Sequence, residues 1–258
     1  MRNPHGTPIW YEYHAVDADR AQAFYERLFG WQVAPSGDVA GMDYRIVSTA
    51  GGEGVAGLMP RPDPNARAGW LFYIGVDDVD AAIATAQAAG GTLLMPAVDM
   101  DGVGRMALLA DAEGQPFYVM RGAMDQPSRA FAVPPETAPG QMVWNELTTP
   151  DQDGALAFYA RLLGWTQERG MSMGPLGEYR FVDAGPTCIG ATMPVLPNGT
   201  PGWLFYAEVE DVDAAIARLT SMGGTVLQGP DPIPGDAFSV VAADPDGARI
   251  GFVGPRAA

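Results

Sequence analysis

The strongest constraint on the fold is an internal repeat, because two copies of one sequence form two similar structures. Residues 22–31, QAFYERLFGW, match residues 156–165, LAFYARLLGW, at seven of ten positions. Residues 69–84 match residues 202–217 at thirteen of sixteen positions. The offset is 134 in the first match and 133 in the second, so a small insertion or deletion separates two copies of about 120 residues. This period is too long for a solenoid and indicates duplicated domains.

The repeat divides the chain into three parts. We expect a first domain over residues 1–122, a linker over residues 123–140 and a second domain over residues 141–258. The linker is rich in proline and small residues, as interdomain segments are. A total of 258 residues suits two domains of ordinary size.

Within each copy, the same succession of a strand, a helix and three further strands is predicted to occur twice. Residues 8–14 are rich in aromatic and β-branched types and predict a strand. Asp17 or Asp19 can cap the following helix, and Gly30 ends it. The buried face of this helix is predicted to consist of Ala21, Phe24, Tyr25 and Leu28. Short strands are predicted around 31–34, 43–48 and 54–59.

The same order follows in the second half of the copy. A strand over 70–76 leads to a helix over 79–89 that Asp78 caps. Further strands are predicted near 92–96, 104–110 and 116–121. The sequence therefore predicts an α+β fold of four βαβββ motifs, which curl in pairs around a concave face.

Composition and charge exclude several classes of protein. Hydrophobic residues make up 47% of the chain and charged residues 18%, which is enough for a full core. No apolar run of 18 residues appears, and the first ten residues lack the shape of a signal peptide, so we expect a cytoplasmic protein. One cysteine, Cys188, excludes an intramolecular disulfide and a multi-cysteine metal site.

The net charge is strongly negative. Asp and Glu number 31 against 15 basic residues, all of them arginine, which gives a formal charge of -16. Such a surface repels phosphate backbones and anionic lipids. We therefore expect a small-molecule ligand and neither nucleic acid nor a membrane as partner. The duplicated domains favour either a monomer that mimics a dimer or a homodimer.

The repeated motifs resemble the vicinal oxygen chelate superfamily, which holds glyoxalase I, bleomycin-resistance and fosfomycin-resistance proteins and extradiol dioxygenases. The resemblance covers nearly the whole chain. It rests on three patterns that occur in both copies, D-x(6)-F-Y-x(4)-G-W, V-[DE]-D-V-D-A-A and D-x-x-G, which begin at Asp17, Val76, Asp111, Asp151, Val209 and Asp244. It implies tandem domains of two βαβββ motifs each, and it specifies the fold more narrowly than the activity.

The resemblance also implies where metal ligands would lie. Metal-dependent members usually draw His or Glu ligands from the first and last strands of each motif. The corresponding residues here are Trp10, Gly57, Leu71 and Tyr118, and in the second copy Trp144, Gly190, Leu204 and Gly251. None is a credible ligand, so we expect no metal or other cofactor. A nonstandard site that uses Glu12 or Glu146 stays open, although oxygen donors alone suit hard cations better than zinc.

The most informative feature of the predicted site is a Trp and a Glu that occur together in both copies. Side chains alternate along a strand, so Trp10, Glu12 and His14 share one face, as do Trp144 and Glu146. Each carboxylate can act as a general base or hold a cation beside an indole. Alternatively, each pairs with a nearby arginine across the sheet, such as Arg45, Arg105 or Arg180.

Other residues are predicted to line the same concave faces. Tyr73, Tyr118 and Tyr206 are spaced to do so. Glu208 aligns with Gly75, so the two copies differ in charge.

Two functions remain open from the sequence. The first is metal-independent binding of a small organic molecule in an aromatic, acidic pocket lined by the residues above. The second is glyoxalase-like chemistry, as a lyase, isomerase or hydroxylase, with Glu12 or Glu146 as general base.

Overall fold

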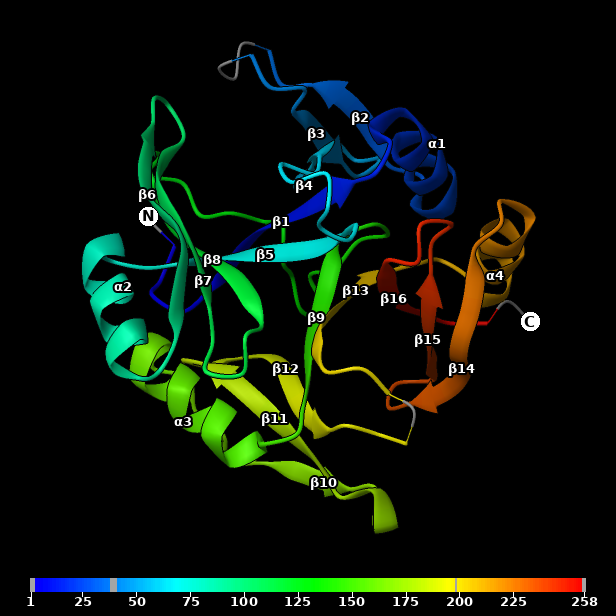
Figure 1. Ribbon diagram of the computed structural model, residues 1–258. Helices are drawn as coiled ribbons and strands as arrows, with labels where there is room; N and C mark the ends of the chain where they lie inside the picture. The colour runs from blue at the N-terminus through cyan, green and yellow to red at the C-terminus, as the bar shows by residue number, and fades with distance from the viewer. Residues whose placement is uncertain (1–2, 38–40, 198, 257–258) are drawn as a thin grey trace. The chain divides into compact units, whose positions relative to one another are not determined.

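The structure, a computed structural model, describes residues 3–37, 41–197 and 199–256, and they form four βαβββ motifs in chain order (Figure 1). The first motif comprises β1 (Pro8–Ala15), α1 (Ala18–Phe29), β2 (Gln32–Pro35), β3 (Arg45–Ser48) and β4 (Gly54–Pro60). The second comprises β5 (Gly69–Gly75), α2 (Val79–Ala88), β6 (Thr92–Met100), β7 (Gly104–Ala110) and β8 (Pro116–Gly122).

The second half of the chain repeats this order. The third motif comprises β9 (Met142–Thr149), α3 (Gln152–Leu163), β10 (Gly170–Ser172), the short helix η1 (Gly174–Leu176), β11 (Glu178–Ala184) and β12 (Thr187–Pro194). The fourth comprises β13 (Gly202–Glu208), α4 (Val212–Ser221), β14 (Thr225–Ile233), β15 (Ala237–Ala243) and β16 (Arg249–Gly254).

The strands form two eight-stranded mixed sheets. Their orders are β2-β3-β4-β1-β5-β8-β7-β6 and β10-β11-β12-β9-β13-β16-β15-β14. Within each motif the first strand pairs in parallel with the last, and the remaining pairs are antiparallel. The predicted α+β class and the four motifs are therefore confirmed.

The chain packs into two compact units, each of which draws on both sequence repeats. Unit 1 contains Met1–Ile9, Leu71–Ser128 and Asn145–Trp203, and therefore most of the second and third motifs. Unit 2 contains Trp10–Trp70, Arg129–Trp144 and Leu204–Ala258, and therefore most of the first and fourth. Contacts within a unit thus join segments that are far apart in the sequence.

The helices begin and end where the sequence predicts. The carboxylate of Asp17 accepts a hydrogen bond from the backbone N–H of Arg20, and Gly30 ends α1 in the left-handed conformation at φ 71°. The residues predicted for the inner face of α1 are all buried. Asp78 caps α2 in the same way. These N-cap carboxylates bond to backbone N–H groups of the first turn, which lack a partner within the helix.

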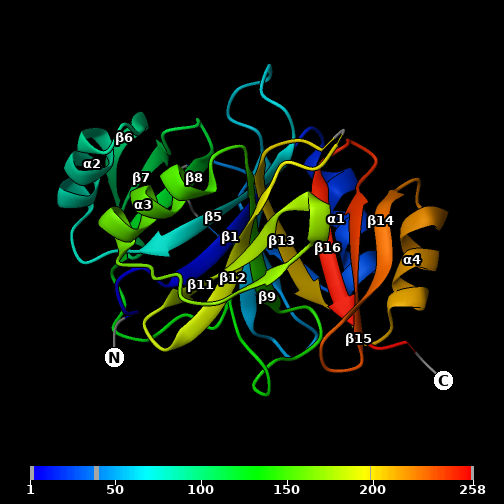
Figure 2. The same ribbon diagram turned by 90° about the horizontal axis from the view of Figure 1, so that it is seen from below.

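Helices of one unit pack in pairs, α1 with α4 in unit 2 and α2 with α3 in unit 1 (Figures 1 and 2). In each pair an arginine of one helix bonds to a backbone carbonyl of the other. Arg218 Nε donates to the Leu28 carbonyl at 3.1 Å, and Arg161 donates to the Ala88 carbonyl at 3.5 Å. Both arginines reach the last turn of the partner helix, where carbonyl groups lack partners.

The core of unit 2 is built around a buried aspartate. Tyr13 and Tyr25 both donate hydrogen bonds to Asp244 Oδ2, and Trp70 Nε1 donates to the Tyr25 hydroxyl at 2.9 Å. The other oxygen of Asp244 accepts backbone N–H groups of its own turn, which Gly247 closes at φ 85°. Burial and the aspartate raise the pKa of both tyrosines.

Unit 1 repeats this core with one donor fewer. Tyr159 donates to Asp111 Oδ2 at 2.9 Å, and Trp203 Nε1 donates to the Tyr159 hydroxyl at 3.1 Å. Leu147 stands where the first motif has Tyr13. Burial, with Asp111 next, raises the pKa of Tyr159 well above its usual value. The aspartate of the D-x-x-G pattern therefore organises the core in both units. No helix in the described part of the chain has the length and apolar character that crossing a membrane requires.

Candidate functional site

The first strand of the first motif places two sets of side chains on opposite faces. Tyr11 and Tyr13 are fully buried in the core of unit 2. Trp10, Glu12 and His14 lie on the other face, as the alternation predicts. Glu12 Oε1 and His14 Nε2 are 2.7 Å apart, and their side chains are 3% and 14% exposed. The structure therefore brings two of the predicted site residues into direct contact as a buried carboxylate–imidazole pair.

A tyrosine that precedes β3 completes this face. The indole N–H of Trp10 donates to the Tyr44 hydroxyl at 3.0 Å. Tyr44 reaches over Gly57, where an added Cβ would lie 2.0 Å from the hydroxyl oxygen. Gly57 is the register partner of Glu12 on the neighbouring strand β4. We define Trp10, Glu12, His14 and Tyr44 as the β1 site.

The third motif carries a related but different arrangement. The Tyr179 hydroxyl donates to Glu146 Oε2 at 2.7 Å. The register partner of Glu146 on β12 is Ala191, whereas Gly190 pairs with Asn145. The counterpart of Gly57 is therefore Ala191, and the expectation that placed it at Gly190 is corrected. An alanine methyl group now fills the space that the Tyr44 hydroxyl occupies in the first motif.

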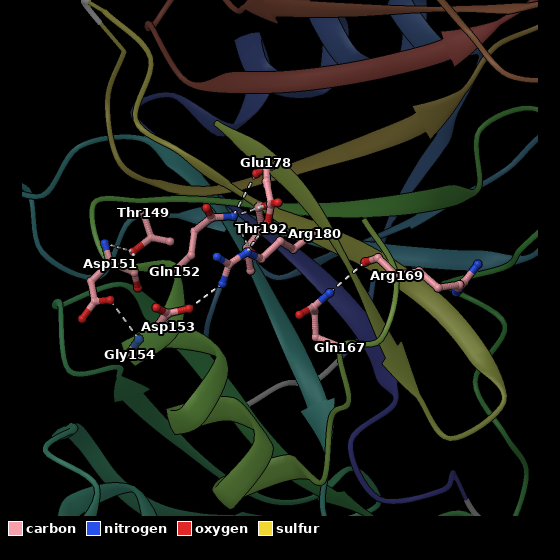
Figure 3. Close-up of polar contacts among 10 residues, drawn as sticks. All are labelled: Thr149, Asp151, Gln152, Asp153, Gly154, Gln167, Arg169, Glu178, Arg180 and Thr192. Atoms are coloured by element: carbon pink, nitrogen blue, oxygen red, sulfur yellow. Dashed lines mark hydrogen bonds and ion pairs between the residues drawn. The ribbon is translucent and has the colours of Figure 1, made fainter. Parts of the chain in front are cut away.

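The three candidate arginines pair with carboxylates other than Glu12 and Glu146. The ion pairs are Arg45 with Asp19 and Asp43, Arg105 with Asp80 and Asp99, and Arg180 with Asp153 and Glu178. Figure 3 shows Arg180 of β11 beside Asp153 in the first turn of α3. At the same end of α3, the Asp151 carboxylate accepts from the Gly154 N–H, and the Gln152 side chain donates to carbonyl groups of β11 and β12. None of these ion pairs involves Glu12 or Glu146, and the alternative that a nearby arginine neutralises each glutamate stays a prediction.

The remaining predicted residues divide between the two units. Trp144, Tyr206 and Glu208 belong to unit 2 with the β1 site, and Tyr73 and Tyr118 belong to unit 1 with Glu146. The rings of Tyr73 and Tyr118 stack at 4.1 Å with an interplanar angle of 4°. Tyr206 covers Gly251, where an added Cβ would lie 2.2 Å from the ring.

Glu208 closes a short backbone pairing with the segment before β9. Its N–H donates to the Gln141 carbonyl at 2.9 Å, and its carbonyl accepts from the Gly140 N–H at 2.8 Å. These contacts fix the backbone of Glu208 at the end of β13. They involve no side-chain atom of Glu208, so its place in a ligand site stays a prediction.

The residues at the implied ligand positions do not fit a catalytic metal. Aromatic rings occupy the space at three of them, with Tyr44 over Gly57, Tyr206 over Gly251 and Tyr118 stacked on its neighbour. Within residues 3–37, 41–197 and 199–256, no three His, Cys, Asp or Glu side chains converge on a point where an ion could bind. A divalent catalytic metal typically needs about three protein ligands.

The surface of unit 1 has two hollows, and neither is lined by a residue of the β1 site or by Glu146. One is lined by Asn3, Ile9, Gly75, Val76, Met120, Arg121, Gly122 and Met124. The other is lined by His5, Asp77, Asp78, Ala81, Ala82, Thr85 and Leu162. A small molecule at the β1 site would instead meet Trp10 and His14, which are partly exposed, with Glu12 behind them.

Tyr44 and Tyr179 are the site residues that sequence reasoning missed. Both stand in a repeated Tyr-Arg pair, at residues 44–45 and 179–180. This repetition was a usable signal. Their contacts with the first strand were less accessible, because they depend on which strand neighbours β1 and in what register.

Comparisons with known proteins agree on one family. The family model described as "Glyoxalase/Bleomycin resistance protein/Dioxygenase superfamily" matches residues 141–252, and the model "Glyoxalase-like domain" matches residues 11–120. The chain is 34% identical over 255 residues to "Putative glyoxylase CFP32" of Mycobacterium tuberculosis, covering 97% of this chain and 95% of the relative. It is 29% identical over 271 residues to "Anthracycline biosynthesis protein DauV" of a Streptomyces species, covering 98% and 94%.

Solved structures share the fold at low sequence identity. The Mn(II)-bound glyoxalase from Novosphingobium aromaticivorans matches with a TM-score of 0.66 at 19% identity, over 97% of this chain and 82% of that chain. The 2,3-dioxygenase LapB from Pseudomonas sp. KL28 matches with a TM-score of 0.65 at 14% identity, over 98% and 94%.

Proposed function

Because the chain belongs to the glyoxalase/bleomycin resistance protein/dioxygenase superfamily, we propose that it binds a small organic molecule at an aromatic and acidic site, without the usual metal of that superfamily. The observation that carries the proposal is the β1 site, where a buried carboxylate, an imidazole, an indole and a phenol share one face of the first motif. Aromatic side chains supply contact area, and the polar groups fix the orientation of a ligand.

The names of two relatives supply the chemical class of ligand that we propose. Two of the relatives are anthracycline biosynthesis proteins, and an anthracycline is a planar aromatic polycycle. Such a ring system can stack on Trp10 and Tyr44, while a donor group on it bonds to the Glu12–His14 pair. The acidic surface favours a neutral or cationic ligand over an anionic one. We therefore use an anthracycline as the probe.

Binding is tested by titrating an anthracycline with the full-length chain and following the fluorescence of its chromophore. Glu12→Gln should weaken binding by about tenfold or more, because it removes a buried hydrogen bond to a charged group. Glu136→Gln, which makes the same change in charge at an exposed turn, should leave the Kd unchanged. Absence of saturable binding, or equal losses in the two variants, would contradict the proposal.

A second candidate function is catalysis by a lyase, isomerase or hydroxylase with a glutamate as general base. The 2.7 Å contact between Glu12 and His14 favours it, because such a pair can accept and pass on a proton. Glu146, which accepts a hydrogen bond from a tyrosine, is the weaker choice. Turnover is tested with the adduct of a 2-oxoaldehyde and a thiol in deuterated water. Deuterium incorporation that Glu12→Gln abolishes supports catalysis, whereas no incorporation leaves binding as the function.

We also propose a cytoplasmic location and no nucleic-acid or membrane partner, on the strength of the charge and the single cysteine. The two candidate states of assembly, monomer and homodimer, are distinguished by light scattering on the purified chain.

A further inference from the structure

The contact between Glu12 and His14 distinguishes the two ring nitrogens of the imidazole. Nε2 of His14 lies 2.7 Å from Glu12 Oε1. A carboxylate without a proton has only acceptor atoms, so beside it Nε2 is the donor, and Nδ1 is the ring nitrogen left to accept a proton. Within the described residues, the structure gives His14 no other hydrogen bond.

Burial orders the two groups with respect to a ligand. The side chain of Glu12 is 3% exposed and that of His14 is 14% exposed. A molecule that approaches this face therefore meets the imidazole before the carboxylate. The Glu12 carboxylate acts on such a molecule through the imidazole ring, which the carboxylate orients. Carboxylates behind a functional histidine orient it in the same way in other proteins.

The third motif lacks this device. Thr148 stands at the position of His14, and the Tyr179 hydroxyl donates to Glu146. The only other histidine in the sequence is His5, and both of its ring nitrogens are engaged. Its Nε2 lies 3.0 Å from the Leu162 carbonyl, and its Nδ1 accepts from the Asp77 N–H at 3.2 Å.

We infer that Nδ1 of His14 is the proton-accepting atom of the β1 site, that Glu12 is its positioning residue, and that the third motif has no equivalent. This assignment rests on the proposed function in that a small molecule is bound against the β1 site. A proton passes from an acidic C–H or O–H of that molecule to Nδ1, and the electron pair of the broken bond stays on the donor atom. The resulting imidazolium keeps its Nε2–H on the Glu12 carboxylate, which stabilises the positive charge.

The tautomer is measured directly by two-bond proton–nitrogen NMR on the full-length chain labelled with ¹⁵N-histidine, at pH 8. His14→Gln assigns the two rings. We expect a proton on Nε2 of His14 and a bare Nδ1, and a mixture of tautomers in Glu12→Gln. A proton on Nδ1 of His14 in the unmodified chain overturns the inference, as does a tautomer that Glu12→Gln leaves unchanged.

Chemical modification supplies a second readout that needs no ligand. Diethyl pyrocarbonate acylates an unprotonated ring nitrogen, so peptide mass spectrometry should find His14 modified several-fold faster than His5, although His14 is the more buried. Glu12→Gln should slow the reaction at His14, and Glu136→Gln should not. Faster reaction at His5, or equal rates in the two variants, overturns the inference.

The inference and the proposed function fail in different experiments. If the anthracycline does not bind while Nδ1 stays bare and reactive, the proposed ligand class is wrong and the assignment of His14 stands. If the anthracycline binds and protects His14 from acylation, both are supported. Binding with the wrong tautomer at His14 overturns the assignment alone.

Discussion

One difference between the two candidate sites is a single methyl group. Gly57 leaves room for the Tyr44 hydroxyl, which then accepts from the Trp10 indole. Ala191 stands at the same register position in the third motif, and there the equivalent Tyr179 donates to Glu146. The residue on the last strand thus decides how much room the tyrosine hydroxyl has above that strand.

Gly57→Ala should therefore be destabilising. Its Cβ would lie 2.0 Å from the Tyr44 hydroxyl oxygen, so the ring must move and the bond to Trp10 is lost. We expect the free energy of unfolding to fall by about 1–3 kcal/mol, as overpacking usually costs. Chemical denaturation checks this.

The matched control for this substitution is Gly69→Ala, where an added Cβ meets no atom within 4 Å. It should leave stability unchanged or raise it by about 0.4–1 kcal/mol through the unfolded chain. Equal effects of the two substitutions would show that the tyrosine does not depend on the space above Gly57.

At the scale of elements, much of the fold was predictable because local rules act there. The caps Asp17 and Asp78 and the buried face of α1 follow from residue type and spacing, and the structure confirms them. The strand predicted near 92–96 was too short, since β6 runs over Thr92–Met100 and its register shifts twice against β7. Irregular pairing of this kind depends on the partner strand, which a local pattern does not contain.

The cap of α1 gives a prediction at this scale. Asp17→Ala removes the acceptor of the Arg20 N–H and should lower the free energy of unfolding by about 1 kcal/mol. Asp101→Ala makes the same change in composition at an exposed turn and should have almost no effect. Thermal and chemical unfolding of both variants test this, and equal shifts in the two would mean that net charge, not capping, accounts for the loss.

At the scale of the whole molecule, the buried tyrosines control stability at high pH. Burial raises the pKa of Tyr13, Tyr25 and Tyr159, and Asp244 or Asp111 raises it further. In the unfolded chain these groups ionise near pH 10, whereas in the folded protein they keep their protons. Above pH 10 the unfolded state therefore binds fewer protons than the native state, and stability falls as the pH rises.

Each of these tyrosines should contribute a slope of about 1.4 kcal/mol per pH unit to the free energy of unfolding above pH 10. Tyr159→Phe should reduce the slope by that amount, whatever it does to stability at neutral pH. Phe24→Leu, a core substitution without a titrating group, should lower stability and leave the slope unchanged. Urea unfolding between pH 8 and pH 11 gives the slopes, and an unaltered slope in Tyr159→Phe would be contrary to expectation.

The division into compact units could not be read from the sequence. The repeats show which motifs are similar in sequence, but sequence similarity does not determine which motifs pack together. Arg218 lies on α4 and Arg161 lies on α3, and each contacts a helix from the other repeat. The contact between Tyr44 and Trp10 escaped prediction for a related reason, because it depends on which strands are neighbours. The shared face of Glu12 and His14, in contrast, follows from strand alternation alone.

The pairing of the first motif with the fourth has a consequence for biosynthesis. Unit 2 contains Trp10–Trp70 at one end of the chain and Leu204–Ala258 at the other. During translation, the first motif is made before the second and third motifs, and the fourth motif, with which it packs, follows them. The second and third motifs, which pack together, are made one directly after the other. Unit 1 is thus the unit that can form during translation. The four residues of the β1 site all come from the first motif, but the unit that surrounds them also needs the fourth motif, which is made later.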